Sequence, residues 1–194
     1  MTETPGRDEE CGMGDTTAVA LLRGINVGGK NKLAMKAVAE IFAGAGCREV
    51  RTYIQSGNVV FRAARLQGVA EAVRAAIEAE FGLQVPVVLR TAAEMAGAIA
   101  NNPFLRQEID AAWLHVMFLE DEPTAAQVAG LDHGRSLPDA FAVVGREVYL
   151  HLPNGAAKTK LTNAYFDSKL KTVGTQRNWR TVVTLAEMMG ELSR

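Results

Sequence analysis

Residues 51–61, Arg51-Thr-Tyr-Ile-Gln-Ser-Gly-Asn-Val-Val-Phe61, decide the fold. Strand-forming residues flank Ser56-Gly57-Asn58, a sequence typical of a tight turn, so the stretch predicts a β-hairpin. It follows an apolar strand at 17–22 and a helix whose apolar residues recur at helical spacing over 38–45. Because a hairpin comes directly after the first strand and helix, a sheet made only of repeated parallel βα units is excluded.

The remaining elements extend this beginning into a pattern that occurs twice. Helices are predicted at 69–81 and 91–100, separated by a strand at 85–89 whose proline favours an edge strand or the end of a strand. The second half repeats the order with strands at 113–119, 141–144, 148–152 and 175–177 and helices at 124–131, 160–171 and 182–192. Two βαββαβ units are the ferredoxin-like pattern. We therefore predict an α+β protein with a disordered tail at 1–15 and two ferredoxin-like lobes, 16–102 and 103–194, each with an additional helix at its end.

Composition restricts the class of protein. The chain has 194 residues, of which 48% are hydrophobic and 22% charged, as in ordinary globular domains. No apolar run approaches the roughly 18 residues of a membrane span, and the acidic N-terminus does not resemble a signal peptide. The two cysteines, Cys11 and Cys47, argue against a disulfide framework. We expect a reduced, cytoplasmic protein without a membrane partner, and its oligomeric state stays open.

Several segments closely resemble a bacterial family of unknown function, DUF1697. They are Ala20–Lys32, Val50–Phe61, Val144–Leu150, Lys158–Asn163 and Arg177–Trp179. The resemblance extends over about residues 17–192. It implies a two-lobed, ferredoxin-like α+β fold in a cytoplasmic bacterial protein, and it implies no activity, substrate, cofactor or catalytic residue. One departure is Ala34, where similar sequences often carry proline, at the predicted start of the first helix.

The segment between the first strand and the first helix is rich in glycine and basic residues. From Thr16 to Ala39 there are four basic residues and no acidic one. Glycines let backbone N–H groups turn toward an anion, the following helix start adds its dipole, and a lysine adds a point charge. We therefore predict an anion-binding loop. Its candidate ligand-binding residues are Arg23, Gly24, Asn26, Gly28, Gly29, Lys30 and Lys32.

Two other interpretations of this loop stay open at the level of sequence. Residues 24–30 match the Gly-x4-Gly-Lys part of a P-loop, but Asn31 stands where that motif has the Ser or Thr that binds magnesium. The predicted hairpin also conflicts with the parallel sheet of P-loop enzymes. In the other interpretation the glycines only shape a turn and the lysines are solvated.

A second basic segment and the hairpin tip extend the candidate site. Between Lys158 and Arg180 there are six basic residues and one acidic residue, and segregated positive charge favours phosphate-bearing partners. Amide and hydroxyl groups at the hairpin tip either form hydrogen bonds to the edge of a ligand or only stabilise the turn. We expect both basic segments to face one cleft between the lobes. The further candidates are Gln55, Ser56, Asn58, Lys158, Lys160, Asn163, Arg177 and Asn178.

One sheet face of the second lobe suggests a different class of function. Alternation predicts a core face made of Leu114, Val116, Phe118, Val148, Leu150 and Leu152. The opposite face would carry Trp113, His115, Met117, Tyr149 and His151. Such rings form a platform on which RNA-recognition modules stack bases. Packing against the other lobe or a terminal helix is the alternative use of this face.

No catalytic or metal-binding constellation stands out in the sequence. There is no nucleophile elbow, zinc helix or helically spaced carboxylate pair, and the three histidines lack a metal-ligand pattern. Cys47 follows a helix C-terminus, whose dipole raises the pKa of a thiol. The sequence favours a protein that binds a phosphorylated small molecule or nucleotide in a basic cleft between the lobes. RNA or DNA binding and phosphotransfer are the alternatives, and enzyme status and cofactor stay open.

Overall fold

Two antiparallel sheets of four strands form the framework of the computed structural model, which describes residues 14–29, 31–107 and 109–194. The first half contains β1 (Thr16–Leu22), α1 (Met35–Gly44), β2 (Arg48–Tyr53), β3 (Asn58–Ala63), α2 (Val69–Phe81), β4 (Val87–Thr91) and α3 (Ala92–Ala100). The second half contains β5 (Leu114–Leu119), α4 (Ala125–Ala129), β6 (Ala140–Val144), β7 (Glu147–His151), α5 (Asn163–Leu170), β8 (Gly174–Asn178) and α6 (Trp179–Leu192). Two short 3-10 helices, Pro103–Arg106 and Ala111–Trp113, lie between the halves.

The strand order is the same in both halves. It is β2-β3-β1-β4 in the first sheet and β6-β7-β5-β8 in the second, and all neighbours are antiparallel. The predicted mixture of helices and strands and the repeated element order are confirmed. β4 is an edge strand, one of the two positions that its proline favoured, but it begins at Val87, directly after Pro86, and not at the predicted Val85.

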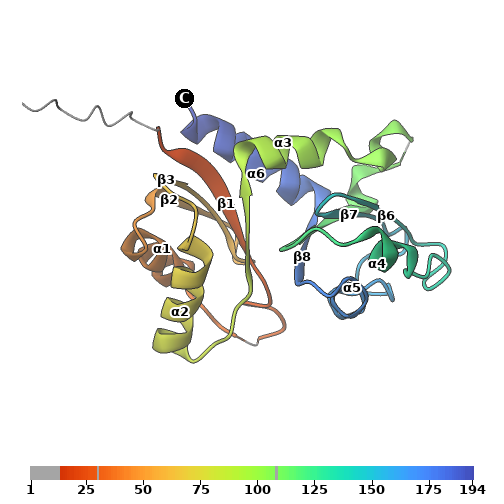
Figure 1. The fold of residues 1–194 in the computed structure, drawn as a ribbon, viewed down its shortest axis with the longest axis horizontal. Helices are drawn as coiled ribbons and strands as arrows, with labels where there is room; N and C mark the ends of the chain where they lie inside the picture. Colours follow the sequence, from red (N-terminus) through yellow and green to blue (C-terminus); the bar gives the residue numbers. More distant parts are fainter. Residues whose placement is uncertain (1–13, 30, 108) are drawn as a thin grey trace, which may run out of the picture.

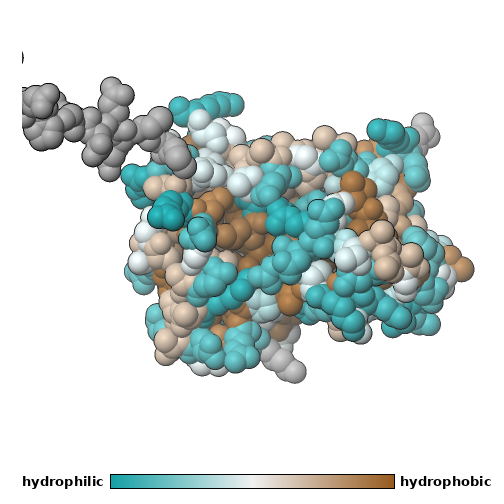
Figure 2. Space-filling model, in the orientation of Figure 1, coloured by the Kyte–Doolittle hydropathy of each residue, from teal (hydrophilic) through white to brown (hydrophobic). Residues whose placement is uncertain are grey.

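The helices divide into three layers around the two sheets (Figure 1). α1 and α2 cover one face of the first sheet, and α4 and α5 cover one face of the second. α3 and α6 lie between the sheets, where Val19 and Val60 of the first half pack in one core with Val116 and Tyr149 of the second. α6 belongs to the second half by sequence, yet it contacts β1 and β3 of the first. The halves therefore share a core. On the surface seen in Figure 2, hydrophobic side chains gather in hollows and do not form one broad face.

The predicted faces of the second sheet are wrong. Val116 pairs directly with Tyr149 across the antiparallel ladder, and directly opposed residues share a face. Tyr149 therefore lies with Val116 and Phe118 in the core between the halves, whereas Val148 and Leu150 pack toward α4 and α5. Both faces of this sheet are apolar. Alternation within one strand therefore does not show which of its side chains share a face with those of the neighbouring strand.

The side chains predicted to form an open aromatic platform do not share a face. Met117 lies on the α5 side and Tyr149 on the α6 side, and both are fully buried. The Tyr149 hydroxyl donates to the carbonyl of Ala98 in α3 at 2.9 Å, and burial raises its pKa. Tyr149 thus packs against the other half of the molecule, which was the alternative use of this face.

Candidate functional site

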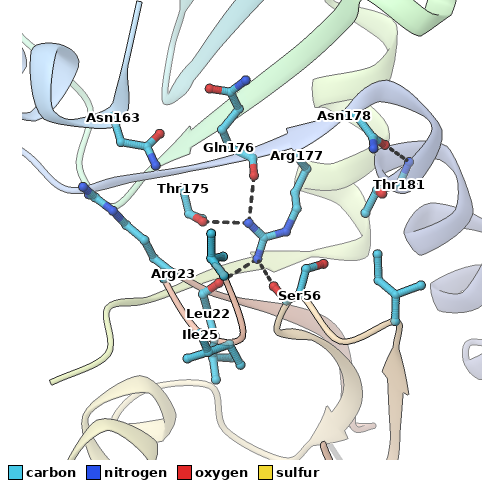
Figure 3. Close-up of a pocket in the computed structure, with 13 residues that line it drawn as sticks. Leu22, Arg23, Ile25, Ser56, Asn163, Thr175, Gln176, Arg177, Asn178 and Thr181 are labelled. Atoms are coloured by element: carbon cyan, nitrogen blue, oxygen red, sulfur yellow. Dashed lines mark hydrogen bonds between the residues drawn. The ribbon is translucent and has the colours of Figure 1, made fainter. Parts of the chain in front are cut away.

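A pocket of about 490 Å³ opens where the two halves of the molecule meet (Figure 3). Its first wall comes from the end of β1, the glycine-rich loop and the β2–β3 hairpin: Leu22, Arg23, Gly24, Ile25, Val27, Ile54 and Ser56. Its second wall comes from β8 and the starts of α5 and α6: Asn163, Thr175, Gln176, Arg177, Asn178 and Thr181.

Left-handed backbone shapes the glycine-rich loop between β1 and α1. Gly24, Gly28 and Gly29 have φ of 73°, 58° and 76°, and Asn26 and Asn31 have φ of 55° and 49°. Glycine enters this region freely, and asparagine is among the most tolerant of the other residues. The glycine and asparagine content of the loop therefore follows from its backbone conformation.

The Asn26 side chain stabilises this loop through hydrogen bonds. Its Nδ2 donates to the carbonyls of Leu33 and Gln55 at 2.8 and 2.9 Å, and its Oδ1 accepts from the Leu33 N–H at 2.8 Å. Both ends of the amide are thus engaged by the loop and by the hairpin beside it. The structure gives Asn26 a positioning role next to the pocket.

The β2–β3 hairpin tip packs closely against the end of β1. Gly57 has a φ of 79°, and a Cβ at this position would lie 2.8 Å from Leu22 Cβ and 3.0 Å from Ile25 Cδ1. The Leu22 N–H donates to the Gly57 carbonyl at 2.8 Å. Buried Asn58 donates from Nδ2 to Ser56 Oγ at 3.0 Å. Glycine at 57 therefore permits the close approach that brings Ser56 to the pocket wall.

Arg177 in β8 reaches across the pocket wall into the first half. Its guanidinium is buried and donates to six protein oxygens, four of them in the first half. The acceptors are the carbonyls of Leu22, Ser56, Gly57 and Gln176, Asn58 Oδ1 and Thr175 Oγ1, at 2.5 to 3.3 Å. Burial lowers the pKa of Arg177 to about 10, so the side chain keeps its charge at neutral pH. Arg177 holds the halves together, and its N–H groups are already engaged.

Arg90 in β4 makes the reciprocal contact from the first half to the second. It is 1% exposed and donates to the carbonyls of Leu119 and Arg146 at 2.7 and 3.1 Å. Its Nε also donates to the Glu147 carboxylate at 2.9 Å. Burial lowers the pKa of the Arg90 guanidinium, and Glu147 opposes that effect.

The two arginines occupy corresponding positions in the two halves. Each opposes a valine in the central strand, Val19 for Arg90 and Val116 for Arg177, and each immediately precedes the N-cap residue of the next helix. Arg90 donates to Leu119, the last residue of β5, and to Glu147, the first residue of β7. Arg177 donates to the corresponding residues of the first half, Leu22 at the end of β1 and Asn58 at the start of β3. The halves are therefore a structural repeat joined by reciprocal arginines.

The two arginines differ in counter-charge. The Glu147 carboxylate meets Arg90, whereas the neutral Asn58 amide takes the corresponding place at Arg177, 2.5 Å from its Nε. Among the residues that the structure describes, no carboxylate accepts a hydrogen bond from Arg177. A buried charge loses several kcal/mol of solvation, and without a counter-ion it leaves a positive potential in its surroundings.

Arg23 adds a second guanidinium to the pocket. Its Nη1 donates to the Asp167 carboxylate at 2.5 Å and to the Gly174 carbonyl at 3.1 Å. The Arg23 and Asp167 side chains are each 24% exposed. Among the described residues Arg177 donates to no carboxylate, so Asp167 is the single carboxylate beside the two guanidinium groups, and the net charge of these three side chains is positive.

Two helix starts also lie at the second wall. α5 begins at Asn163 and α6 begins directly after Asn178, whose Oδ1 accepts from the Thr181 N–H at 2.8 Å. Free N–H groups in the first turn of a helix carry partial positive charge. Oδ1 of Asn163 is buried and has no hydrogen-bond partner among the described residues. The second wall thus combines positive helix ends with an acceptor that lacks a donor.

Comparison with known proteins places the chain in a family. The model of the family described as "Protein of unknown function (DUF1697)" matches residues 16–149. The chain belongs to the DUF1697 family. Among solved structures, this DUF1697 protein is similar to the conserved bacterial protein SP0830 from Streptococcus pneumoniae, with a TM-score of 0.70 and 21% identity. The match covers 91% of this chain and 99% of that chain and supports the fold. No curated protein matches the chain.

Six residues predicted to bind a ligand in this DUF1697 protein line the pocket. They are Arg23, Gly24, Ser56, Asn163, Arg177 and Asn178, and they come from both predicted basic segments and from the hairpin tip. Asn26, Gln55 and Asn58 instead lie outside the lining, where their amide or carbonyl groups join the loop and hairpin hydrogen bonds. Gly28, Gly29, Lys32, Lys158 and Lys160 are exposed and outside the lining. Lys30 lies outside the described residues.

The helix start that the sequence predicted for anion binding does not lie at the pocket. The prediction used the helix after the glycine-rich loop, but no residue of α1 lines the pocket. α5 and α6 of the opposite half supply the helix starts instead. Sequence order alone does not show this, because the contact crosses between the two halves.

Several lining residues were missed from sequence. They are Leu22, Ile25, Val27, Ile54, Thr175, Gln176 and Thr181. Thr181 follows Asn178 at the spacing of an N-cap and the residue it caps, which was a usable signal. Arg90 was also missed, although a basic residue at the end of an apolar strand is a recognisable exception.

The described part of the chain contains two arginines at the pocket but no cluster of side chains that could bind a metal. No group of three or more His, Cys, Asp or Glu side chains gathers there to hold a metal, and no helix there is long and apolar enough to cross a membrane. Cys47 is buried, and burial raises its thiol pKa to about 11. The sequence predicted a raised pKa for Cys47, and this direction is confirmed. The cause is burial of the thiol, whereas the prediction had invoked the helix dipole.

Proposed function

We propose that this DUF1697 protein binds a phosphorylated small molecule or nucleotide in the pocket between its halves. The observation that carries the proposal is Arg177, a buried guanidinium on the pocket wall with no carboxylate among its described acceptors. Charges interact more strongly in such surroundings than in water. An anion in the pocket would supply the counter-charge that Glu147 supplies to Arg90.

Arg23 and the two helix starts support an anion of the phosphate type. Helix N-termini bind phosphate through free N–H groups and the helix dipole. Because the N–H groups of Arg177 are engaged within the protein, these other groups would make the direct hydrogen bonds, while Arg177 contributes its field. The pocket of about 490 Å³ falls in the range of about 300–1,000 Å³ for small-molecule sites. The ligand would therefore be a phosphate ester, larger than inorganic phosphate.

We also infer that each half is a ferredoxin-like lobe. The βαββαβ order and the central position of the first and third strands support this assignment. The lobe boundaries proposed at 102 and 103 fit the end of α3 at Ala100 and the 3-10 helix at Pro103–Arg106. The bacterial source of SP0830 supports a bacterial origin for this chain, and a cytoplasmic location stays a prediction.

Nucleic-acid binding and phosphotransfer are the alternative hypotheses. The aromatic face that suggested the first is divided between two buried cores. The antiparallel sheet around the glycine-rich loop differs from the parallel sheet of P-loop enzymes, which weakens the second. The pocket supports small-molecule binding better than either.

The proposal is tested by thermal unfolding with pairs of phosphorylated and unphosphorylated compounds. Adenosine 5′-monophosphate is compared with adenosine, and ribose 5-phosphate with ribose. A ligand at a hundred times its Kd stabilises the folded state by about 2.7 kcal/mol. This raises the midpoint of a chain of this size by about 5–11 °C. Saturable shifts from the phosphorylated member of a pair support the proposal.

Equal shifts from both members of each pair, or no shift at all, would contradict it. Tight oligonucleotide binding that weakens steeply with salt would favour the nucleic-acid hypothesis instead. Magnesium-dependent turnover of ATP would favour phosphotransfer.

A further inference from the structure

The free edge of β8 directs the main-chain N–H of Asn178 away from its sheet, at the wall of the pocket. In the ladder with β5, the Glu120 N–H donates to the opposing Val173 carbonyl at 2.8 Å. Bonded and non-bonded pairs alternate along an antiparallel ladder, so the N–H and C=O groups of Gln176 and the N–H of Asn178 point outward. The Gln176 carbonyl agrees, because it accepts from Arg177 Nη1 at 2.8 Å in the pocket wall (Figure 3). Among the residues that the structure describes, none accepts the Asn178 N–H.

The equivalent N–H in the first half donates to a carboxylate of the chain itself. Thr91 is the N-cap residue of α3, as Asn178 is of α6. The Thr91 N–H donates to Glu94 Oε2 at 2.7 Å and thereby completes a capping box. The other carboxylate oxygen of Glu94 forms an ion pair with Arg146 of the second half. The repeat therefore shows which chemical group this outward N–H binds, namely an anion that a guanidinium group also contacts.

Neither member of that ion pair has a counterpart at the pocket. Thr181 stands three residues after Asn178, where α3 has Glu94, so α6 keeps only the half of the box in which the Asn178 side chain accepts. Gly57 stands directly before the third strand of its half, as Arg146 does. The carbonyls of Gly57 and Arg146 both accept from the last residue of the first strand at 2.8 Å, which confirms that the two positions correspond. Two small residues thus stand at or beside the pocket, where the equivalent positions in the repeat hold an ion pair.

We infer that the anionic group of the ligand accepts the Asn178 N–H, in the place that the Glu94 carboxylate takes in the first half. This inference rests on the proposed function, because it names the donor that binds the charged group directly. Arg177 immediately precedes Asn178, so a buried cation with no carboxylate among its described acceptors and the outward N–H act on the same anion. Thr181 then determines whether the N–H is open to a ligand, because a glutamate at that position would complete the capping box.

Nuclear magnetic resonance of the ¹⁵N-labelled wild type tests the donor directly. Ribose 5-phosphate and adenosine 5′-monophosphate are titrated while the amide resonances of Asn178 and Thr91 are followed. We expect the Asn178 amide proton to move downfield with saturation, because it gains an anionic acceptor. At a hundred times the Kd its exchange with solvent should slow by about a hundredfold, because exchange then occurs only from the free protein. Thr91, whose N–H already has an acceptor, should change in neither respect.

The variant Thr181→Glu gives α6 the capping box that α3 has. Its carboxylate should accept the Asn178 N–H and weaken the binding of both probes by about tenfold to a hundredfold, the value of a hydrogen bond to a charged group. The matched control is Thr184→Glu, which adds the same charge to the same helix outside the pocket lining. We expect the control to bind both probes as the wild type does in calorimetric titration. The unfolding midpoint of each variant shows whether it is folded.

Other results would overturn one of the two proposals. If the probes bind and the Asn178 resonance does not move, the inference is wrong and the proposed function stands. If a folded Thr181→Glu protein binds both probes as tightly as Thr184→Glu does, the inference is also wrong. If Thr181→Glu does not fold, the titration of the wild type decides by itself. If neither probe binds the wild type, the proposed function on which the inference rests is contradicted.

Discussion

Replacing Asn58 by aspartate should turn the environment of Arg177 into that of Arg90. The Asn58 Oδ1 lies 2.5 Å from Arg177 Nε, so the new carboxylate would stand where Glu147 meets Arg90. The two residues differ by one atom, and the substitution adds a single negative charge at a known place. We expect Asn58→Asp to fold and to lose most of its affinity for anions.

The magnitude follows from Coulomb's law. A ligand anion on the far side of the guanidinium would be about 7 Å from the new carboxylate, and an effective dielectric constant of about 20 gives a repulsion of about 2.4 kcal/mol for one unit of ligand charge. This corresponds to a Kd about fiftyfold higher. In the folded protein alone, Asn58 loses its Nδ2 hydrogen bonds to Tyr53 and Ser56, which cost about 1 kcal/mol each, and the new ion pair with Arg177 offsets that loss.

The assay is calorimetric titration with adenosine 5′-monophosphate, with the unfolding midpoint measured in parallel. Gln67→Glu is the matched control, because it adds the same charge at an exposed position outside the pocket lining. We expect the control to bind as the wild type does. If a folded Asn58→Asp protein binds the nucleotide as tightly as the control, the positive potential of Arg177 does not hold the ligand and the reasoning fails.

Three further changes test other parts of the structure. Gly57→Ala should destabilise the protein by about 2–4 kcal/mol in urea unfolding, because it combines left-handed strain with a clash against the end of β1. Gly155→Ala, with a φ of 82° but open space around it, should cost only about 1–2 kcal/mol, and equal losses would refute the packing argument. Burial raises the pKa of Cys47 from 9.0 to about 11, so the folded state keeps a proton that the unfolded state releases between these values. Stability should therefore fall by about 1.4 kcal/mol per pH unit across that window, and a Cys47→Ala variant that keeps this part of the slope would contradict the assignment. Asp167→Asn should neutralise the partner of Arg23 and tighten the binding of phosphorylated ligands several-fold in the same titration, whereas weaker binding would show that Asp167 serves the ligand.

Local sequence signals were sufficient for the order of the elements. The β2–β3 hairpin was predictable because Gly57, with a φ of 79°, supplies the left-handed conformation that its turn needs. The start of α5 was placed too early, at Lys160, because charged residues at helical spacing do not show where the chain turns. The Thr162 side chain, which accepts from the Tyr165 N–H, fixes the observed start at Asn163.

Long-range features could not be predicted in the same way. The phase of β7 relative to β5 depends on their register, and both faces of that sheet are apolar, so Tyr149 was assigned to the wrong side. Counting cations identified Arg23 and Arg177 but could not show that the N–H groups of Arg177 are occupied by carbonyls of the other half. Those carbonyls lie more than a hundred positions away in the chain.

The reciprocal arginines also bear on synthesis of the chain from its N-terminus. When the first half has been made, Arg90 has none of its acceptors in the second half, and the carbonyls of Leu22 and Ser56 lack their donor. Hence a nascent first half carries an unmatched cation and unmatched acceptors until the second half has been synthesised and packs against it.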